Sequence, residues 1–520
     1  MKRLYVIAVA VAVLGISSPV GANICSMDVV PASTLLFPFV TYDYEADGNG
    51  QTTIISITNV SSQARIVRVT VWADYSIAVL TFNVVLTGYD LQTINIRDIL
   101  RDGVVPSESS GANIWWDGTE SSNAGGSPFD DGPYSTHNAL WGGSLDSYFS
   151  TSGLPDPEST NPLDCDPAVW ASSPNNYTYD IPPGVLDMIE AFLRASEKTT
   201  TGYRGCDWAD DVVFPDGTWF TSNDAVSTAE TWFTNQESKP TLMYITADVV
   251  GSCNRDFPDS DWLSYFGAVG GIQTANVLMG DVVYIDPSTD FAEAENAVHI
   301  EAGPHPTAST TFYNRYHGGA GFEDREPLPT AWAFRYIQSN NRQADTWIRT
   351  WKGSTQSHLA IDLDDADTGP GGTISDLNPS ALYANTCIPY TYYAWDDDEN
   401  VNSVSSGSVS GWSSGGLSDP IPVPNLFPLE TQEVPIDEFF VVGDDFGNAV
   451  GWMMVIWPLS NWNGVNPPIL DYDQYQTWMS VKYKAFGRFT ATMQGMVIAN
   501  YNCDATQTLP QLGIDLHGGD

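Results

Sequence analysis

The sequence predicts a mainly β protein made of one or more immunoglobulin-like or related β-sandwiches, with a loop-rich insertion and one short amphipathic helix. Short stretches of alternating apolar and polar residues, rich in β-branched and aromatic side chains, predict half-buried strands. These stretches recur at intervals of roughly 8–12 residues with turn residues between them, as in sandwiches. With 42% hydrophobic residues in 520, the chain can form packed cores, which excludes global disorder.

Residues 1–22 have the pattern of a secretory signal peptide. Lys2 and Arg3 form the charged region, an apolar run follows, and Val20-Gly21-Ala22 resembles a cleavage site. The apolar run is too short to span a bilayer, which needs about 20 residues. We therefore expect a secreted protein without a transmembrane segment, located outside the cell, on its surface or in the periplasm.

Residues 23–100 predict the N-terminal part of a sandwich. In the stretch TTIISITNV, Thr53, Ile55 and Ile57 fall on one face of the expected strand. In ARIVRVTVWAD, valines alternate in the same way, and two more strands are expected on either side of Gly88. The intervening turns are short and polar, which favours antiparallel neighbours.

Residues 101–180 are rich in Gly, Ser, Asp, Asn and Pro, which predicts a loop-rich insertion. Residues 181–200 contain the clearest helical pattern, in PPGVLDMIEAFLRASEK. Its apolar stripe, which we interpret as a packing face, consists of Val185, Met188, Ile189, Phe192 and Leu193.

Residues 201–520 predict a second β-rich region, with one or two sandwich domains. The expected strands include TLMYITADVV, NVLMGDVVYIDP, TAWAFRYI, DTWIRTW, HLAIDLD, PYTYYAW, EFFVVGD, GWMMVIW and TWMSVKYKAFGRFTATMQGMVIANYNC. The Ser/Gly-rich stretch at 401–416 predicts a mobile loop.

Six cysteines follow the signal peptide: Cys25, Cys165, Cys206, Cys253, Cys387 and Cys503. In an exported chain an even number of widely spaced cysteines predicts three disulfides, and the sequence leaves their pairing open.

The chain is strongly acidic, with a formal net charge of −44. Such a surface repels phosphate backbones and anionic lipids, so we expect no nucleic-acid partner. The acidity fits either a solvated surface or a capacity for calcium.

The stretch DYEADGNG is a candidate calcium loop, because Asp43, Glu45 and Asp47 alternate before Gly48. A calcium loop needs such oxygen ligands and a glycine bend. However, Asp-Gly and Asn-Gly are also strong hairpin signals, and we favour the turn. Asp362, Asp364 and Asp367 form a second candidate calcium set in IDLDDADTGPGG.

No pattern of residues predicts a particular reaction. His299, Glu301 and His305 lack the helical spacing of a zinc protease site, and the chain lacks the G-x-S-x-G nucleophile motif of esterases. Glycoside hydrolysis stays open because it needs only two suitably placed carboxylates. The aromatic candidates for sugar stacking are Trp115, Trp116, Trp141, Trp170, Trp347 and Trp351.

Several segments resemble a group of uncharacterised secreted β-rich proteins from environmental bacteria, for which no activity is established. These segments are TLLFPFVTYD, RVTVWAD, LTGYDLQTINIRDIL, YITADVVGSC, NVLMGDVVYIDP, VHIEA and REPLPTAWAFRY. The resemblance implies export and a β-rich fold, and it transfers no catalytic residue.

From these patterns we expect a non-enzymatic extracellular or cell-surface protein with a structural or adhesive role. The alternative is a carbohydrate-binding or carbohydrate-cleaving secreted protein. Its partners would be other copies of the chain or a surface polysaccharide.

Overall fold

A computed structural model gives the structure of the chain. It describes residues 29–46, 49–74, 78–104, 114–115, 186, 189–190, 193–194, 240–251, 265–266, 271–288, 290–303, 311–313, 325–338, 344–353, 390–396, 401–405, 430–436, 450–457, 476–485 and 489–499.

The described residues form three antiparallel sheets and one short helix, which confirms the prediction of a mainly β, sandwich-like protein. The ten-stranded sheet contains β1 (Thr34–Tyr42), β2 (Thr52–Asn59), β3 (Arg65–Ala73), β4 (Ala78–Leu86), β5 (Leu91–Asn95), β6 (Ile114–Trp115), β7 (Thr241–Val250), β8 (Leu278–Asp286), β9 (Phe291–Asn296) and β10 (Val298–Ile300). The five-stranded sheet contains β11 (Ala331–Ile337), β13 (Thr391–Asp396), β14 (Val401–Ser405), β16 (Val450–Ile456) and β19 (Met496–Ala499). The four-stranded sheet contains β12 (Ala344–Gly353), β15 (Thr431–Pro435), β17 (Gln476–Ala485) and β18 (Phe489–Gln494).

The ten-stranded sheet bends at a corner between β1 and β2, where only Tyr42 and Thr52 pair. One limb has the order β6-β4-β3-β7-β1, with β10 also on β1, and the other contains β5, β2, β8 and β9. The two limbs pack face to face, since a Cβ on Gly280 of β8 would lie 2.7 Å from Leu35 of β1. β7 lies between β1 and β3, so strands far apart in sequence complete this first sandwich.

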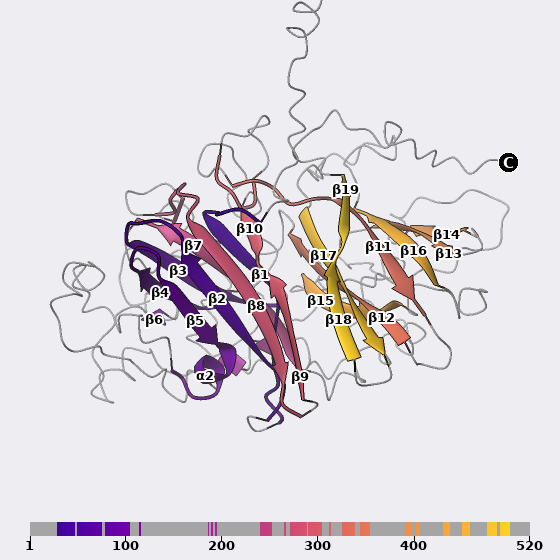
Figure 1. Ribbon diagram of the computed structural model, residues 1–520, viewed down its shortest axis with the longest axis horizontal. Helices are drawn as coiled ribbons and strands as arrows, with labels where there is room; N and C mark the ends of the chain where they lie inside the picture. Colours follow the sequence, from indigo (N-terminus) through magenta and orange to yellow (C-terminus); the bar gives the residue numbers. More distant parts are fainter. Residues whose placement is uncertain are drawn as a thin grey trace, which may run out of the picture.

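The four- and five-stranded sheets form a second sandwich beside the first (Figure 1). Trp332 of β11 connects them, because its Nε1 donates to Thr477 Oγ1 of β17 at 2.9 Å. Residues 489–499 also connect them, with β18 in one sheet and β19 in the other. Gly495 lies between these strands, and a Cβ there would lie 3.0 Å from the Trp332 ring.

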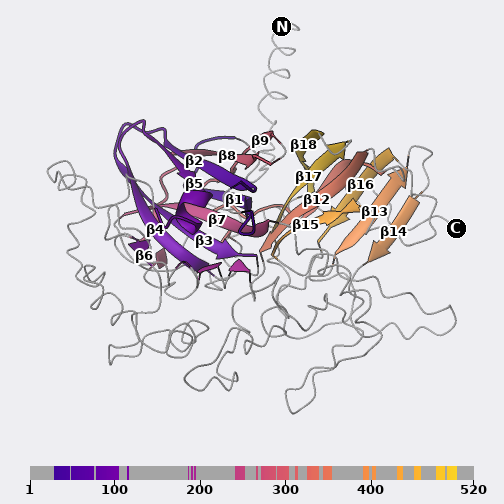
Figure 2. The same cartoon turned by 90° about the horizontal axis from the view of Figure 1, so that it is seen from below.

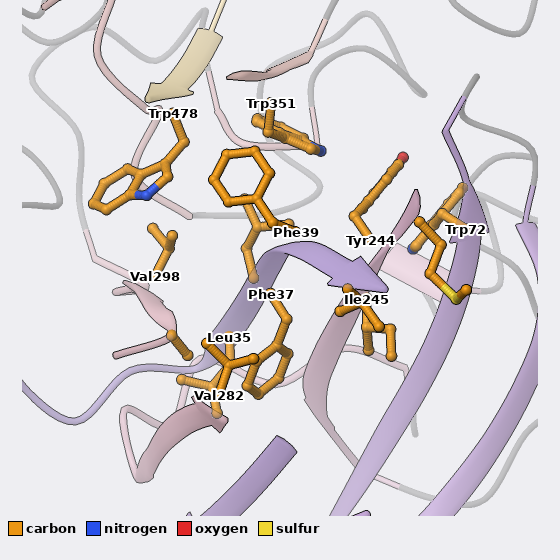
Figure 3. Close-up of a cluster of buried hydrophobic side chains, with 14 of the residues drawn as sticks. Leu35, Phe37, Phe39, Trp72, Tyr244, Ile245, Val282, Val298, Trp351 and Trp478 are labelled. Atoms are coloured by element: carbon orange, nitrogen blue, oxygen red, sulfur yellow. The ribbon is translucent and has the colours of Figure 1, made fainter. Parts of the chain in front are cut away.

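The four-stranded sheet faces the first sandwich, and β13 and β14 lie at the far end of the molecule (Figure 2). Trp351 of β12 contacts the Tyr244 ring of β7 edge-on, with 5.9 Å between centroids. Main-chain N–H groups of Glu430 and Thr431 donate to the carbonyl of Asp74. Figure 3 shows Phe39, Tyr244, Trp351 and Trp478 in one cluster. The core is therefore continuous across the joint between the sandwiches.

Two details differ from the sequence-based expectations. Residues Ile96–Leu100, which follow β5, form a short helix, α2, because the Asn95 side chain accepts from Arg97 N–H and caps it. Residues 401–405 form strand β14 where a mobile loop was expected, since their main chain pairs with β13. None of the helices among the described residues is long and apolar enough to cross a membrane.

The other predicted segments are described only in part. Of the helical stripe at 181–200, Ile189 and Leu193 are described, helical and fully buried. The insertion at 101–180 lies almost wholly outside the described residues, as do all six cysteines.

Candidate functional site

The first half of DYEADGNG forms a turn in which the Asp43 side chain has a local role. Asp43 Oδ1 accepts hydrogen bonds from the N–H groups of Glu45 at 3.0 Å and Ala46 at 3.2 Å. Gly50 packs against this carboxylate, since a Cβ there would lie 2.5 Å from Asp43 Oδ2. This geometry is that of an Asx-type turn, in which the side chain replaces a main-chain acceptor.

Glu45 is also engaged with the protein. Its Oε1 lies 2.7 Å from Nη2 of Arg194, which pairs with Glu190 as well and lies over the Tyr44 ring. Asp47, Asp362, Asp364 and Asp367 lie outside the described residues. In the part of the chain that the structure describes, no three His, Cys, Asp or Glu side chains gather as a metal site. Calcium binding stays a prediction.

Among the described residues, six charged side chains gather at the joint between the sandwiches. We call Glu293, Glu295, Arg349, Glu433, Lys482 and Lys484 the joint cluster. Arg349 Nε donates to Glu433 Oε2 at 2.8 Å, and its Nη1 lies 3.7 Å from Glu295 Oε1. Lys482 and Lys484 lie 3.7 and 3.4 Å from the Glu433 carboxylate.

Strand alternation explains why these side chains meet. Trp347, Arg349 and Trp351 lie on the face of β12 that is turned toward the first sandwich, where Arg349 stacks over Tyr284 of β8 at 4.8 Å. Glu433 lies directly opposite Arg349 on β15, and the two lysines project from the same face of β17. Glu293 and Glu295 share one face of β9, the strand at the edge of the first sandwich.

The two carboxylates that contact Arg349 have opposite pKa shifts. Burial raises the pKa of Glu295 to about 7, although Arg349 opposes the shift. Burial acts in the same direction on Glu433, but Lys482, Arg349 and Lys484 outweigh it and hold the Glu433 pKa well below its usual range. Burial also lowers the pKa of Lys482 to about 8. A carboxylate pair split in this way can provide one proton donor and one charged group near neutral pH.

A second buried network surrounds Asp248 on the first sandwich. Arg68, Asp248 and Thr34 are cross-strand neighbours on β3, β7 and β1, and all three are fully buried. Tyr265 and Tyr313 each donate to Asp248 Oδ2 at 2.6 Å, and Thr34 Oγ1 donates to Oδ1. Arg325 donates to Thr34 and lies 3.9 Å from the carboxylate. This network was not predicted, because its local signal in the sequence is limited to polar residues within the apolar strands β1, β3 and β7.

The third feature is an aromatic patch on the outer face of the five-stranded sheet, made of Arg335, Tyr393, Trp395, Val450 and Trp452. Trp395 of β13 and Trp452 of β16 are direct cross-strand neighbours, stacked at 3.9 Å with planes 9° apart. Gly451 permits this close approach, because a Cβ there would lie 1.8 Å from the Trp395 carbonyl oxygen. Alternation in PYTYYAW and GWMMVIW signals that these rings share a face, but the cross-strand register cannot be obtained from the sequence.

The structure accounts for several other candidate residues. His299 Nε2 accepts from the N–H of Gly280 at 3.3 Å, which occupies one of the two ring nitrogens that could bind zinc. His305 lies outside the described residues, as do Trp116, Trp141 and Trp170. Trp351 is fully buried in the joint, and Lys484 Nζ lies 3.7 Å over the Trp347 ring. Trp351 therefore has no open face for sugar stacking, and one face of the half-buried Trp347 is taken by Lys484.

Comparison with known proteins adds no relative, since no family model, no curated protein and no solved structure matches the chain.

Proposed function

We propose that the protein is a secreted, acidic protein with a structural or adhesive role outside the cell or at its surface. The observation that carries this proposal is the buried joint between the two sandwiches. Aromatic packing, main-chain hydrogen bonds to Asp74 and the joint cluster all cross it. A joint of this kind makes two sandwiches one stiff unit, which suits a protein that must transmit load.

The signal-peptide pattern and the cysteine count support the location. Export through the signal peptide would allow the six cysteines to form three disulfides, which strengthen proteins in oxidising surroundings. The net charge of −44 keeps such a surface hydrated and opposes aggregation.

Calorimetry of the purified mature chain tests whether the two sandwiches unfold as one unit. We expect one cooperative transition whose calorimetric and van't Hoff enthalpies agree, and a Trp351→Ala variant should separate it into two. Two transitions in the unaltered chain would refute a single load-bearing unit. Fractionation of cells that make the full chain, with labelling of free thiols, tests export and disulfides.

A carbohydrate-cleaving enzyme is the second candidate, favoured by the contact of both Glu295 and Glu433 with Arg349 and by the opposite pKa shifts of these two carboxylates. Glycosidases use one protonated and one charged carboxyl group. Reducing-sugar release from a polysaccharide panel should then fall at least about a hundredfold in both Glu295→Gln and Glu433→Gln. Equal activity in these variants, or none in the unaltered chain, rules this candidate out.

A further inference from the structure

The aromatic patch is partly exposed to solvent, as is Met496 of β19 in the same sheet. Trp452 is 42% exposed although one ring face lies on Trp395, and Val450 is 50% exposed. Farther along the same face, Ala331, Met454 and Ile456 are buried. The end of the sheet near Val450 therefore holds a stacked tryptophan, Trp452, that is partly exposed to solvent.

The position of the patch is compatible with binding. It lies on β11, β13 and β16, at the end of the molecule away from the joint (Figures 1 and 2). The stacked pair is fixed in place, because Tyr336 donates to the Trp395 carbonyl at 3.1 Å. A ligand would meet preorganised rings, so binding would cost little side-chain entropy.

The size of the patch argues against a second copy of the chain. A stable protein interface uses roughly 20–30 residues on each side, whereas the patch and the neighbouring Met496 make six of the described residues. Two such patches facing each other would also bring two strongly acidic chains together. The area instead fits a few sugar rings.

The charge of the protein favours some classes of polysaccharide over others as ligands of the patch. Among the described residues of the patch the one charged member is the exposed Arg335, but the chain as a whole carries −44. Long-range repulsion disfavours a polyanion such as alginate. In cellulose and chitin the ring substituents are equatorial and each ring presents C–H groups on its faces, which suits an aromatic ring.

We propose that the aromatic patch binds a neutral β-linked polysaccharide, with Trp452 as the main contact. The rings pack against sugar C–H faces, and the Arg335 guanidinium donates to hydroxyl groups. This inference rests on the adhesive role proposed above and names its partner. Because the attraction is largely apolar, binding changes little with salt.

Depletion assays with microcrystalline cellulose and chitin, with alginate beads as the anionic comparison, test the proposal on the purified mature chain. Titration with soluble hydroxyethylcellulose, read by tryptophan fluorescence, gives the affinity. We expect binding to cellulose or chitin but not to alginate, and Trp452→Ala should weaken it about tenfold. Trp452→Phe should restore part of it, because a ring remains.

Tyr89→Ala is the matched control. Tyr89 is an aromatic residue of the first sandwich and is 73% exposed, so its removal should leave binding unchanged. An unchanged melting temperature in both alanine variants shows that they fold. Full binding by Trp452→Ala, equal loss in Tyr89→Ala, binding to alginate alone, or no binding to any probe would each overturn the proposal.

The adhesive role is tested separately by attachment of protein-coated beads to cells. Attachment without polysaccharide binding would remove this partner and keep the role. If beads coated with the unaltered protein do not attach to cells, the adhesive role itself is ruled out.

Discussion

The Asp248 network and the joint cluster solve the same problem, a buried carboxylate, in different ways. Asp248 is fully buried and accepts from three hydroxyl groups, with Arg325 nearby. Glu433 is 23% exposed and is surrounded by three cations. In the joint cluster both carboxylate oxygens of Glu293 are buried without a hydrogen-bond partner among the described residues.

This difference indicates which of the two networks responds to salt and pH. Hydroxyl donors compensate a buried charge by directed hydrogen bonds, which salt screens little, whereas ion pairs near solvent respond to salt and pH. We therefore expect the Asp248 network to determine stability and the joint cluster to determine how stability varies with conditions.

The largest effect should come from Asp248→Ala. It leaves Arg325 and two phenols buried without the carboxylate, so the free energy of unfolding should fall by about 3–5 kcal/mol. Urea unfolding followed by tryptophan fluorescence measures it. Tyr313→Phe removes one donor and should cost about 1–3 kcal/mol. A smaller loss in Asp248→Ala than in Tyr313→Phe would contradict this account.

Arg349→Met should have the next largest effect. Arg349 is 3% exposed, and its loss leaves Glu433 with two lysines. Because Glu433 retains contact with solvent, we expect a loss of about 1–3 kcal/mol. Lys484→Met is the matched control, since Lys484 is 37% exposed and should cost less than about 1 kcal/mol. Equal losses of unfolding free energy in the two variants would mean that burial does not determine how much each cation stabilises the fold.

Glu295→Gln should change the pH dependence of stability. The Glu295 pKa is about 7 in the folded chain against 4.5 ordinarily, so the folded state holds the proton more tightly. Its contribution to stability is full below pH about 4.5 and is lost as the pH rises through about 7. Between about pH 5 and 8 the unaltered chain should lose about 1–3 kcal/mol relative to the variant. The assignment would be refuted if the difference in unfolding free energy between the unaltered chain and the variant, measured by urea unfolding, were the same at both pH values.

The smallest effect is expected at the surface pair Arg101–Asp102, whose side chains are 43% and 40% exposed. Arg101→Ala should change the free energy of unfolding by less than about 0.5 kcal/mol. A loss as large as that of Arg349→Met, measured in the same urea series, would show that exposure is a poor guide in this protein.

Alternation and turn residues were sufficient to predict strands such as β2 and β3, in which buried isoleucines or valines recur at every second position. Strands β9, β14 and β15 were not predicted, and each lies at the end of a sheet. An edge strand pairs on one side only and often carries charged or polar residues, as Glu293 and Glu295 of β9 show. Edge strands therefore lack the apolar periodicity on which the predictions depended.

The charged and aromatic clusters could be predicted less well than the strands. Glu295, Arg349 and Glu433 come from three strands that are distant in sequence, and their meeting depends on register and on the packing of one sandwich against the other. Local patterns identify which residues share a face of one strand. They do not identify the strand or the layer that this face meets.

The position of β7 between β1 and β3 has a consequence for biosynthesis. Until residue 250 has been made, the two earlier strands lack the neighbour that pairs with both of them. Unpaired strand edges readily join other chains, and such distant pairing also slows folding. The growing polypeptide should therefore need a chaperone until roughly half of its length has emerged, and co-expression with an edge-binding chaperone should raise the yield.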